Sequence, residues 1–269
     1  MTKKKILITG CSGYIGSHLC NILKDKYIVH GLDIVKPSFS IEVFKLTDIR
    51  YISQHISQNY DTVIHLAALV NVGKSHIDPV SYYETNVLGT INILKYIKAK
   101  NFIFASTGAA VGLSSVYGIS KKAAEDCVAQ MCNTYTIFRF YNVIGGVNPT
   151  NSDGLFFNLL KAAKTGKITI FGKNYNTPDG TCIRDYVHVL EICNSIEQAI
   201  EKPSCSIEHL GHGVGTSVLE IVKTFNRVNN LNIDIIYDQP RVGDLEMSVL
   251  TNPSIYMKQI YTLEDLLKI

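Results

Sequence analysis

A tyrosine and a lysine four residues apart, Tyr117 and Lys121, are the pair in this sequence best suited to acid–base chemistry. Residues four apart on a helix lie on one face with their polar ends close together. A tyrosine hydroxyl has a pKa of ~10 in water, so acting as a base near pH 7 costs roughly 4 kcal/mol. A lysine ammonium beside the ring stabilises the phenolate and lowers that cost. YxxxK also occurs by chance on surface helices, so the rest of the chain must decide between a base and a packing pair.

The pair lies at the start of a predicted helix that follows a predicted strand. The apolar run 101–106 reads as a buried strand, and residues 117–132 have helical spacing. Strands and helices alternate along the chain, which is typical of a doubly wound parallel sheet. Further strands are expected at 3–10, 27–34, 44–49, 61–69 and 135–145, and further helices at 11–26 and 79–98. Beyond residue 146 the expected helices are 156–166, 184–202 after a short extended start, 217–228 and 261–269, and the expected strands are 167–172 and 232–237.

The first strand runs into a glycine-rich loop, TGCSGYIG, that suits a dinucleotide. Gly10 allows a tight turn, Gly13 lets the backbone approach a pyrophosphate, and Gly16 lets helix and strand pack closely. The free N–H groups of the following helix then face the phosphates. Asp33, at the end of the second strand, is placed to bind an adenosine ribose through both hydroxyls. Its carboxylate repels a 2′-phosphate, so the loop predicts NAD as the cofactor, not NADP.

These features divide the chain into two parts. Residues 1–146 are expected to form an NAD-binding Rossmann-type domain that carries the tyrosine–lysine pair. Residues 147–269 are expected to form a smaller C-terminal substrate lobe that is interleaved with the first part and is not a separate module. The chain contains no internal repeat and no low-complexity linker.

Composition limits the partners and the compartment. A formal net charge of +3 is too small and too evenly spread to predict nucleic-acid binding. The 7 cysteines are an odd number without a CxxC spacing, which fits reduced thiols better than a disulfide framework. No apolar run approaches the ~18 residues that a membrane helix needs, and the N-terminus has no signal-peptide layout. We therefore expect a cytoplasmic protein that binds neither nucleic acid nor membrane.

With these residues in place, the sequence resembles the extended short-chain dehydrogenase/reductases, and within them the UDP-glucose 4-epimerases of the NAD-dependent epimerase/dehydratase family. The resemblance runs from about Lys5 to about Pro253. It is carried by the motifs TGCSGYIGSH, HLAALVNVGKS, YYETNVLGT, YGISK, RFYNVIG and FGKNYNTPDGTCIRDYVHV. The last of these is much closer to epimerases than to sugar-nucleotide dehydratases or decarboxylases.

The resemblance implies a role for each matching position. Thr107 corresponds to the catalytic Ser/Thr that binds the sugar 4-oxygen, Tyr117 to the base, and Lys121 to the partner that lowers the pKa of the tyrosine. The implied cofactor-binding residues are Gly10, Gly13, Tyr14, Ile15, Gly16, Asp33, Asp48, Ile49, Ala67, Ala68, Asn86, Tyr117 and Lys121. Among these, Asp48 and Ile49 would flank the adenine. The implied UDP-sugar-binding residues are Asn142, Asn158, Arg184, Arg241, Asp244 and Ser248.

The implied reaction is a 4-epimerisation with no net redox change. The base takes the proton of the sugar 4-hydroxyl while C4 gives its hydride to NAD, and the 4-keto sugar is reduced again from its other face. UDP-glucose and UDP-galactose are the expected substrates. A small residue at Ser248 leaves room for an N-acetyl group, so UDP-N-acetylhexosamines are a second candidate class. The resemblance also implies a homodimer formed through helices 79–98 and 117–132.

Departures from the family pattern leave other functions open. Thr107 and Tyr117 are unusually close in the sequence, which predicts a more open sugar site. The alternatives are a nucleotide-sugar 4-ketoreductase and a catalytically idle NAD-binding protein. A dehydratase is disfavoured because Gly-Ala follows Thr107 where an Asp-Glu pair is needed. No metal is expected: His209 and His212 are assigned structural roles, and Asp185 is expected to form an ion pair that positions Arg184.

Overall fold

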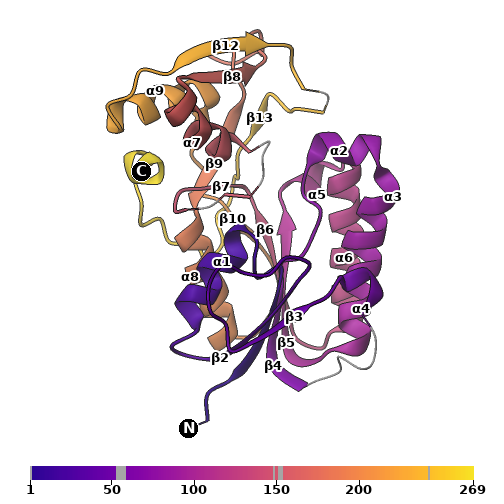
Figure 1. Cartoon of the computed structure of the whole chain (residues 1–269). Coiled ribbons are helices and arrows are strands. Elements are labelled where there is room, and N and C mark those ends of the chain that lie inside the picture. Colours follow the sequence, from indigo (N-terminus) through magenta and orange to yellow (C-terminus); the bar gives the residue numbers. More distant parts are fainter. Residues whose placement is uncertain (1, 53–58, 148, 151–153, 242) are drawn as a thin grey trace. The chain divides into compact units, whose positions relative to one another are not determined.

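The computed structural model describes residues 2–52, 59–147, 149–150, 154–241 and 243–269 (Figure 1). The chain forms two compact units. The first unit contains residues 1–139 and 193–208, and the second contains residues 140–192 and 209–269.

The first unit is built on a mostly parallel sheet with the strand order β10-β6-β5-β4-β1-β2-β3. The pairs β1–β2, β2–β3, β1–β4 and β4–β5 all run parallel. The strands are β1 (Lys5–Thr9), β2 (Ile28–Asp33), β3 (Val43–Leu46), β4 (Asn59–His65), β5 (Lys98–Thr107), β6 (Tyr135–Phe140) and β10 (Cys205–Leu210). β1 is buried along residues 6–9 and β4 along residues 62–65, as a sheet covered on both faces requires. The predicted Rossmann-type sheet is confirmed.

Helices cover both faces of this sheet. Figure 1 shows α1 (Tyr14–Leu23) and α8 (Val189–Glu201) on one side, and α3 (Pro79–Tyr82), α4 (Gly89–Tyr96) and α6 (Val116–Met131) on the other. The remaining helical segments are η1 (Ile49–Tyr51), α2 (Val72–Ile77), the π-helix η3 (Tyr83–Leu88) and α5 (Ala109–Gly112). The core between sheet and helices includes Leu7, Val63, Ile93, Phe102, Phe104, Val128 and Ile137.

The register of the strands brings their carboxyl ends to one edge. Thr9 lies beside Leu32 of β2 and beside His65 of β4, and His65 lies beside Phe104 of β5. The glycine loop that follows β1 and Thr107 at the end of β5 therefore lie at the same edge. Ligands of open parallel sheets bind at this edge.

Several predicted elements have different boundaries in the structure. The predicted helix 79–98 is divided into α3, the π-helix η3 and α4, and β5 already begins at Lys98. The predicted strand 135–145 is two strands, because β7 (Asn142–Ile144) leaves the main sheet and pairs with β9 (Ile183–His188). The extended start of segment 184–202 is this strand β9. Residues 205–210, not predicted as a strand, form the edge strand β10.

The second unit contains two small sheets. In one, β9 pairs with β7, β11 (Gly215–Ser217) and β13 (Met247–Ser248). In the other, β8 (Lys167–Phe171) pairs in parallel with β12 (Asp234–Asp238). The helices are α7 (Leu155–Thr165), α9 (Val218–Val228) and α10 (Leu263–Leu267). Across the described ranges, no helix is both long and apolar enough to cross a bilayer.

Candidate active site

The glycine loop has the geometry that a bound phosphate requires. Gly10 has φ +72°, and a Cβ at Gly16 would lie 2.1 Å from the carbonyl oxygen of Gly10, so both positions need glycine. Gly13 caps α1 without a side-chain hydrogen bond. A Cβ at Gly13 would meet within 4 Å only the Gly10 carbonyl oxygen, at 3.2 Å. The start of α1 is thus a tight turn whose N–H groups carry no side-chain cap, and it fits an anionic pyrophosphate.

Asp33 ties this loop to β2 and keeps acceptor capacity. Its Oδ2 accepts a hydrogen bond from the Ser12 N–H at 2.9 Å, and its Oδ1 accepts one from the Val35 N–H at 3.1 Å. A carboxylate has about four acceptor sites, so each oxygen retains a lone pair for a further donor. Two ribose hydroxyls would use those two sites.

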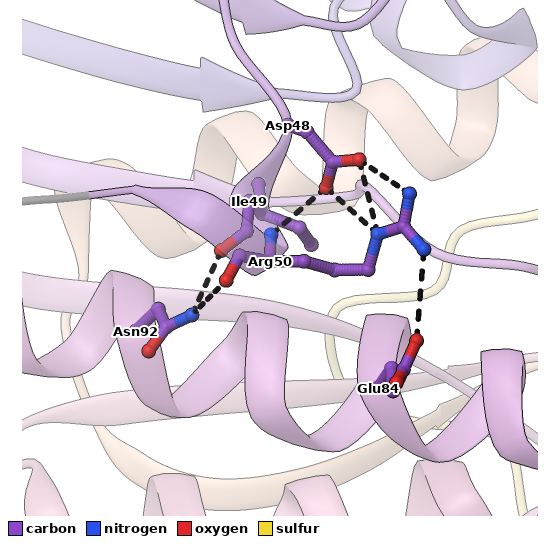
Figure 2. Close-up of polar contacts among 5 residues, drawn as sticks. All are labelled: Asp48, Ile49, Arg50, Glu84 and Asn92. Atoms are coloured by element: carbon purple, nitrogen blue, oxygen red, sulfur yellow. Dashed lines mark hydrogen bonds and ion pairs between the residues drawn. The ribbon is translucent and has the colours of Figure 1, made fainter.

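The segment after β3 shows an ion pair that the sequence analysis missed (Figure 2). The Asp48 carboxylate accepts hydrogen bonds from the Arg50 backbone N–H at 2.9 Å and from its Nε and Nη2 at 3.0 and 2.7 Å. A second guanidinium nitrogen lies 3.7 Å from Glu84. Asn92 donates to the carbonyl oxygens of Ile49 and Arg50 at 3.1 and 2.9 Å. The Arg50 side chain therefore fixes the segment to η3, and the backbone carbonyl groups fix it to α4.

This arrangement changes what Asp48 and Ile49 offer to an adenine. Arg50 already engages both carboxylate oxygens of Asp48, so an adenine amino group would have to share them. The Ile49 side chain is buried, and a Cβ on Gly89 would lie 2.6 Å from its Cδ1. Ile49 therefore offers its main chain to a ligand. The signal in the sequence that could have predicted this ion pair is the spacing of Asp48 and Arg50, which are two residues apart.

The remaining cofactor-binding candidates line or support the same edge. The Ala67 N–H donates to the Thr9 hydroxyl at 3.3 Å, and Ala68 follows directly. The Asn86 side chain accepts from the Leu69 N–H at 2.8 Å and donates to the Leu69 carbonyl oxygen and the Ser120 hydroxyl, both at 3.0 Å. Asn86 thus holds the segment after β4 against α6 and supports the site from η3. Tyr14 and Ile15 form the first turn of α1.

Thr107, Tyr117 and Lys121 come together at the end of β5 and the start of α6. The Thr107 hydroxyl is hydrogen-bonded to the Tyr117 side chain and also accepts from the Ala109 N–H at 3.2 Å. The Lys121 Nζ lies 4.0 Å from the centroid of the Phe104 ring. The Tyr82 ring packs edge-on against Tyr117, with 6.5 Å between centroids.

Burial dominates the protonation of this pair. Burial of the side chain raises the pKa of Tyr117 to about 12, and the hydrogen bond with Thr107 offsets only part of this rise. Loss of solvent also lowers the pKa of Lys121 to about 7, against the opposing charge of Glu125. Burial outweighs any effect of Lys121 here, so the pKa of Tyr117 is raised on balance, and the expectation that Lys121 lowers it stays a prediction. The same burial that disfavours the phenolate also disfavours the ammonium that would stabilise it.

The short connection between Thr107 and Tyr117 is a packed turn. It contains α5, whose residue Ala109 contacts the first turn of α6, and a Cβ at Gly118 would lie 2.4 Å from the Ala109 carbonyl oxygen. The Ser115 hydroxyl caps α6 by accepting from the Gly118 N–H at 3.1 Å. The connection therefore places Tyr117 by direct contact between α5 and α6. The more open sugar site expected from this short connection stays a prediction.

The predicted UDP-sugar residues all lie in the second unit, and three of them form a group. An Arg184 guanidinium nitrogen lies 3.7 Å from Asp244, and Ser248 on β13 pairs in register with Arg184 on β9. The other three lie on separate elements. Arg241 packs 4.0 Å above the Phe171 ring, Asn142 donates to the Asp185 carbonyl oxygen at 3.3 Å, and Asn158 donates to the Gly154 carbonyl oxygen at 2.9 Å.

Asp185 does not have the role expected for it. Its buried carboxylate accepts from the backbone N–H groups of His212 and Gly213, both at 2.9 Å, and of Leu250 at 3.3 Å. Arg184 pairs with Asp244 instead, because neighbouring residues of a strand point to opposite faces. Asp185 therefore fixes the turn after β10. The His212 Nε2 lies 3.0 Å from Glu191, and no group of three or more metal-ligand side chains occurs among the described residues.

The fold and the site together define a class. A parallel sheet with a glycine loop and an acidic residue ending β2, together with a threonine–tyrosine–lysine set on β5 and α6, is the arrangement of a short-chain dehydrogenase/reductase of the extended type. The chain belongs to the NAD dependent epimerase/dehydratase family, whose sequence model matches residues 6–209.

Individual relatives cover nearly the whole chain. A UDP-glucose 4-epimerase of Yersinia pestis is 32% identical, and the match covers 89% of this chain and 87% of that protein. A crystal structure of a UDP-glucose 4-epimerase is 31% identical with a TM-score of 0.80, covering 91% of this chain and 88% of that one. The UDP-glucose 4-epimerase from Brucella ovis in complex with NAD is 25% identical with a TM-score of 0.85, covering 98% and 96%.

Proposed function

We propose that this protein is an NAD-dependent UDP-hexose 4-epimerase that interconverts UDP-glucose and UDP-galactose. The observation that carries the proposal is the set formed by Thr107, Tyr117 and Lys121 at the same sheet edge as the glycine loop. This set supplies a proton acceptor beside a loop that fits a dinucleotide. The similarity to UDP-glucose 4-epimerases over nearly the whole chain supports the substrate.

In the proposed mechanism the chain's own residues bind the reactants and move one proton. NAD, when bound, supplies the acceptor and the donor of a hydride. The Tyr117 hydroxyl oxygen takes up the proton of the sugar 4-hydroxyl and later returns it. Thr107 holds this hydroxyl by a hydrogen bond, and a protonated Lys121 favours its ionised form.

The groups proposed to hold the substrate and the cofactor have matching chemistry. Arg184 and Arg241 have planar guanidinium groups that suit a diphosphate. Gly10, Gly13 and Gly16 would receive the pyrophosphate of NAD, and Asp33 would bind its ribose. We further propose that residues 1–146 mainly bind the cofactor and residues 147–269 mainly the UDP-sugar.

Incubation of the purified protein with UDP-glucose, UDP-galactose and their N-acetyl counterparts, without added cofactor, tests the function. Interconversion without accumulation of NADH is the expected result. A requirement for added NADPH and a 4-keto sugar would instead identify the nucleotide-sugar 4-ketoreductase. Turnover of the N-acetyl substrates would support the space proposed beside Ser248. A protein that binds NAD but converts none of the four would be the idle alternative.

Replacement of Asp33 should alter the choice of cofactor. In Asp33→Ala we expect NAD to bind about 30-fold more weakly, because two ribose hydrogen bonds are lost, each worth roughly 1 kcal/mol. The preference for NAD over NADP should fall as well, because the charge that repels a 2′-phosphate is gone. Titration calorimetry with both dinucleotides measures this. Asp25→Ala, an exposed aspartate of the same unit, is the control and should bind both as wild type does; equal NAD/NADP ratios in Asp33→Ala and wild type would contradict the assignment.

We also propose a cytoplasmic homodimer. Support for the dimer comes from large apolar side chains exposed on and beside α3, η3 and α6: Ile77, Val80, Tyr83, Leu88, Ile119 and Met131. Light scattering should give twice the chain mass of 29.9 kDa. The mass of a single chain would rule the dimer out. The seven cysteines are unpaired, which suits a reducing compartment.

A further inference from the structure

Glu125 is a deeply buried carboxylate that the proposed mechanism does not yet use. It is 1% exposed and lies on α6, one turn beyond Lys121. The Arg139 Nε donates to Glu125 Oε1 at 2.8 Å, and the Arg139 Nη2 donates to Oε2 at 2.6 Å. The Ser106 hydroxyl donates to Oε1 at 2.5 Å. Burying a carboxylate costs several kcal/mol, and this arginine fork with one further donor offsets much of it.

The position of Glu125 connects the elements that carry the reactive set. Ser106 is the residue directly before Thr107 on β5, and Arg139 lies on β6, so the carboxylate joins β5 and β6 to α6. A shift of Ser106 would move Thr107 relative to Tyr117. The hydrogen bond between Ser106 and Glu125 therefore holds the end of β5, which carries Thr107, against α6, which carries Tyr117.

Among the described residues, Glu125, which is itself paired with Arg139, is the charged group that acts on Lys121 most directly. The Lys121 ammonium lies over the Phe104 ring of β5, and on β4 the buried His65 is neutral, because burial and Lys121 lower its pKa to about 3. The side chains of Tyr82 on α3 and Tyr117 are phenols, so neither adds a positive charge beside Lys121. The charged or titratable groups on the other elements packed against α6 are engaged or exposed elsewhere: Glu84 pairs with Arg50, Lys95 lies over Tyr96, and Lys74 and His76 of α2 are exposed.

We propose that Glu125 is a positioning residue for the reactive set, which holds Thr107 in place through Ser106 and holds Lys121 in its ammonium form through its negative charge. The catalytic role of Lys121 rests on the function proposed above. The contacts of Glu125 with Ser106 and Arg139, and its effect on the charge of Lys121, do not depend on that function. Lys121 is fully buried and its pKa lies at about 7, so at neutral pH a nearby negative charge decides how much of it is charged. Because only charged Lys121 favours the phenolate, Glu125 acts on Tyr117 through Lys121.

Glu125→Gln tests the charge with a readout that needs no substrate. In protein containing ¹³C-lysine, the Cε–Hε signal of Lys121, assigned by its loss in Lys121→Arg, is followed against pH. The wild-type midpoint is expected near 7, and in Glu125→Gln it should fall by about 0.5–1 pH unit, because a neighbouring negative charge is removed. The alkaline limb of kcat should move in the same direction, with KM nearly unchanged.

Glu191→Gln is the matched control, because it also removes a buried carboxylate, but in the second unit. It should lower Tm and leave the Lys121 midpoint at its wild-type value. An unchanged midpoint in Glu125→Gln overturns the proposal. A shifted midpoint in a protein that converts no UDP-sugar would refute the proposed function and leave the role of Glu125 intact.

Ser106→Ala tests the tether and is expected to fold even if Glu125→Gln does not. It keeps the carboxylate and removes the hydrogen bond to β5. The Lys121 midpoint should stay at the wild-type value, while kcat falls about 3–10-fold through the loosened Thr107. A kcat within twofold of wild type would show that Glu125 does not hold Thr107.

Discussion

Tyr117→Phe should reduce kcat by about 10²–10⁴-fold while NAD remains bound. The substitution removes one oxygen, which is both the proposed proton acceptor and the partner of Thr107. The ring and its edge-on contact with Tyr82 stay in place, so the fold is retained. The steady-state rate of UDP-galactose conversion and the cofactor content of the purified protein measure the two effects.

The control for this substitution is Tyr237→Phe. Tyr237 lies on β12 in the second unit and is 41% exposed, so loss of its hydroxyl removes a phenol without touching the reactive set. It should leave kcat within about twofold of wild type. A Tyr117→Phe variant that keeps more than a tenth of the wild-type rate would exclude Tyr117 as the base.

Gly118→Ala should both destabilise the protein and slow it. The added Cβ would lie 2.4 Å from the Ala109 carbonyl oxygen, a backbone atom that cannot rotate away, so α5 or the first turn of α6 must move. Overpacking of this kind costs about 1–3 kcal/mol, which exceeds the ~1 kcal/mol that alanine normally contributes over glycine in a helix. Because Tyr117 precedes Gly118, the same shift should lower kcat at least tenfold.

Gly112→Ala is the matched substitution in the same connection. A Cβ there would have no atom within 4 Å, so both Tm and kcat should stay at or slightly above the wild-type values. Thermal unfolding measures the Tm of Gly118→Ala and Gly112→Ala, and steady-state kinetics measure their kcat. Equal Tm values for the two variants would show that the contact between α5 and α6 does not place Tyr117.

The sequence was sufficient for features that depend on local pattern. Apolar runs predicted β1, β2, β4 and β5, and helical spacing predicted α1 and α6 to within a few residues. The glycine spacing predicted where the backbone turns, because Gly10 and Gly16 have no space for a side chain. The short motifs predicted the family, since they lie in a fixed order between these elements.

Long-range pairing decided what local pattern left open. β10 joins the sheet from a distant segment through an edge pairing, and β7 leaves an apparently continuous strand to pair with β9. Neither is encoded by nearby residues. The predicted helix 79–98 widens into the π-helix η3, in which Asn86 binds the backbone of the segment after β4. Such a π-turn is an adjustment to tertiary contacts and has no simple periodic signature.

The same division applies to the chemistry of the site. The sequence by itself pointed to Tyr117 and Lys121 through their spacing, because residues four apart share a helix face, and it pointed to Thr107 through the family resemblance. The charge states were decided by the tertiary structure, because burial raises the pKa of Tyr117 and lowers that of Lys121. Glu125 became visible only when β5, β6 and α6 were packed together, since its partners lie 19 and 14 residues away along the chain. Desolvation and contacts of this kind depend on the folded interior, and local sequence does not encode them.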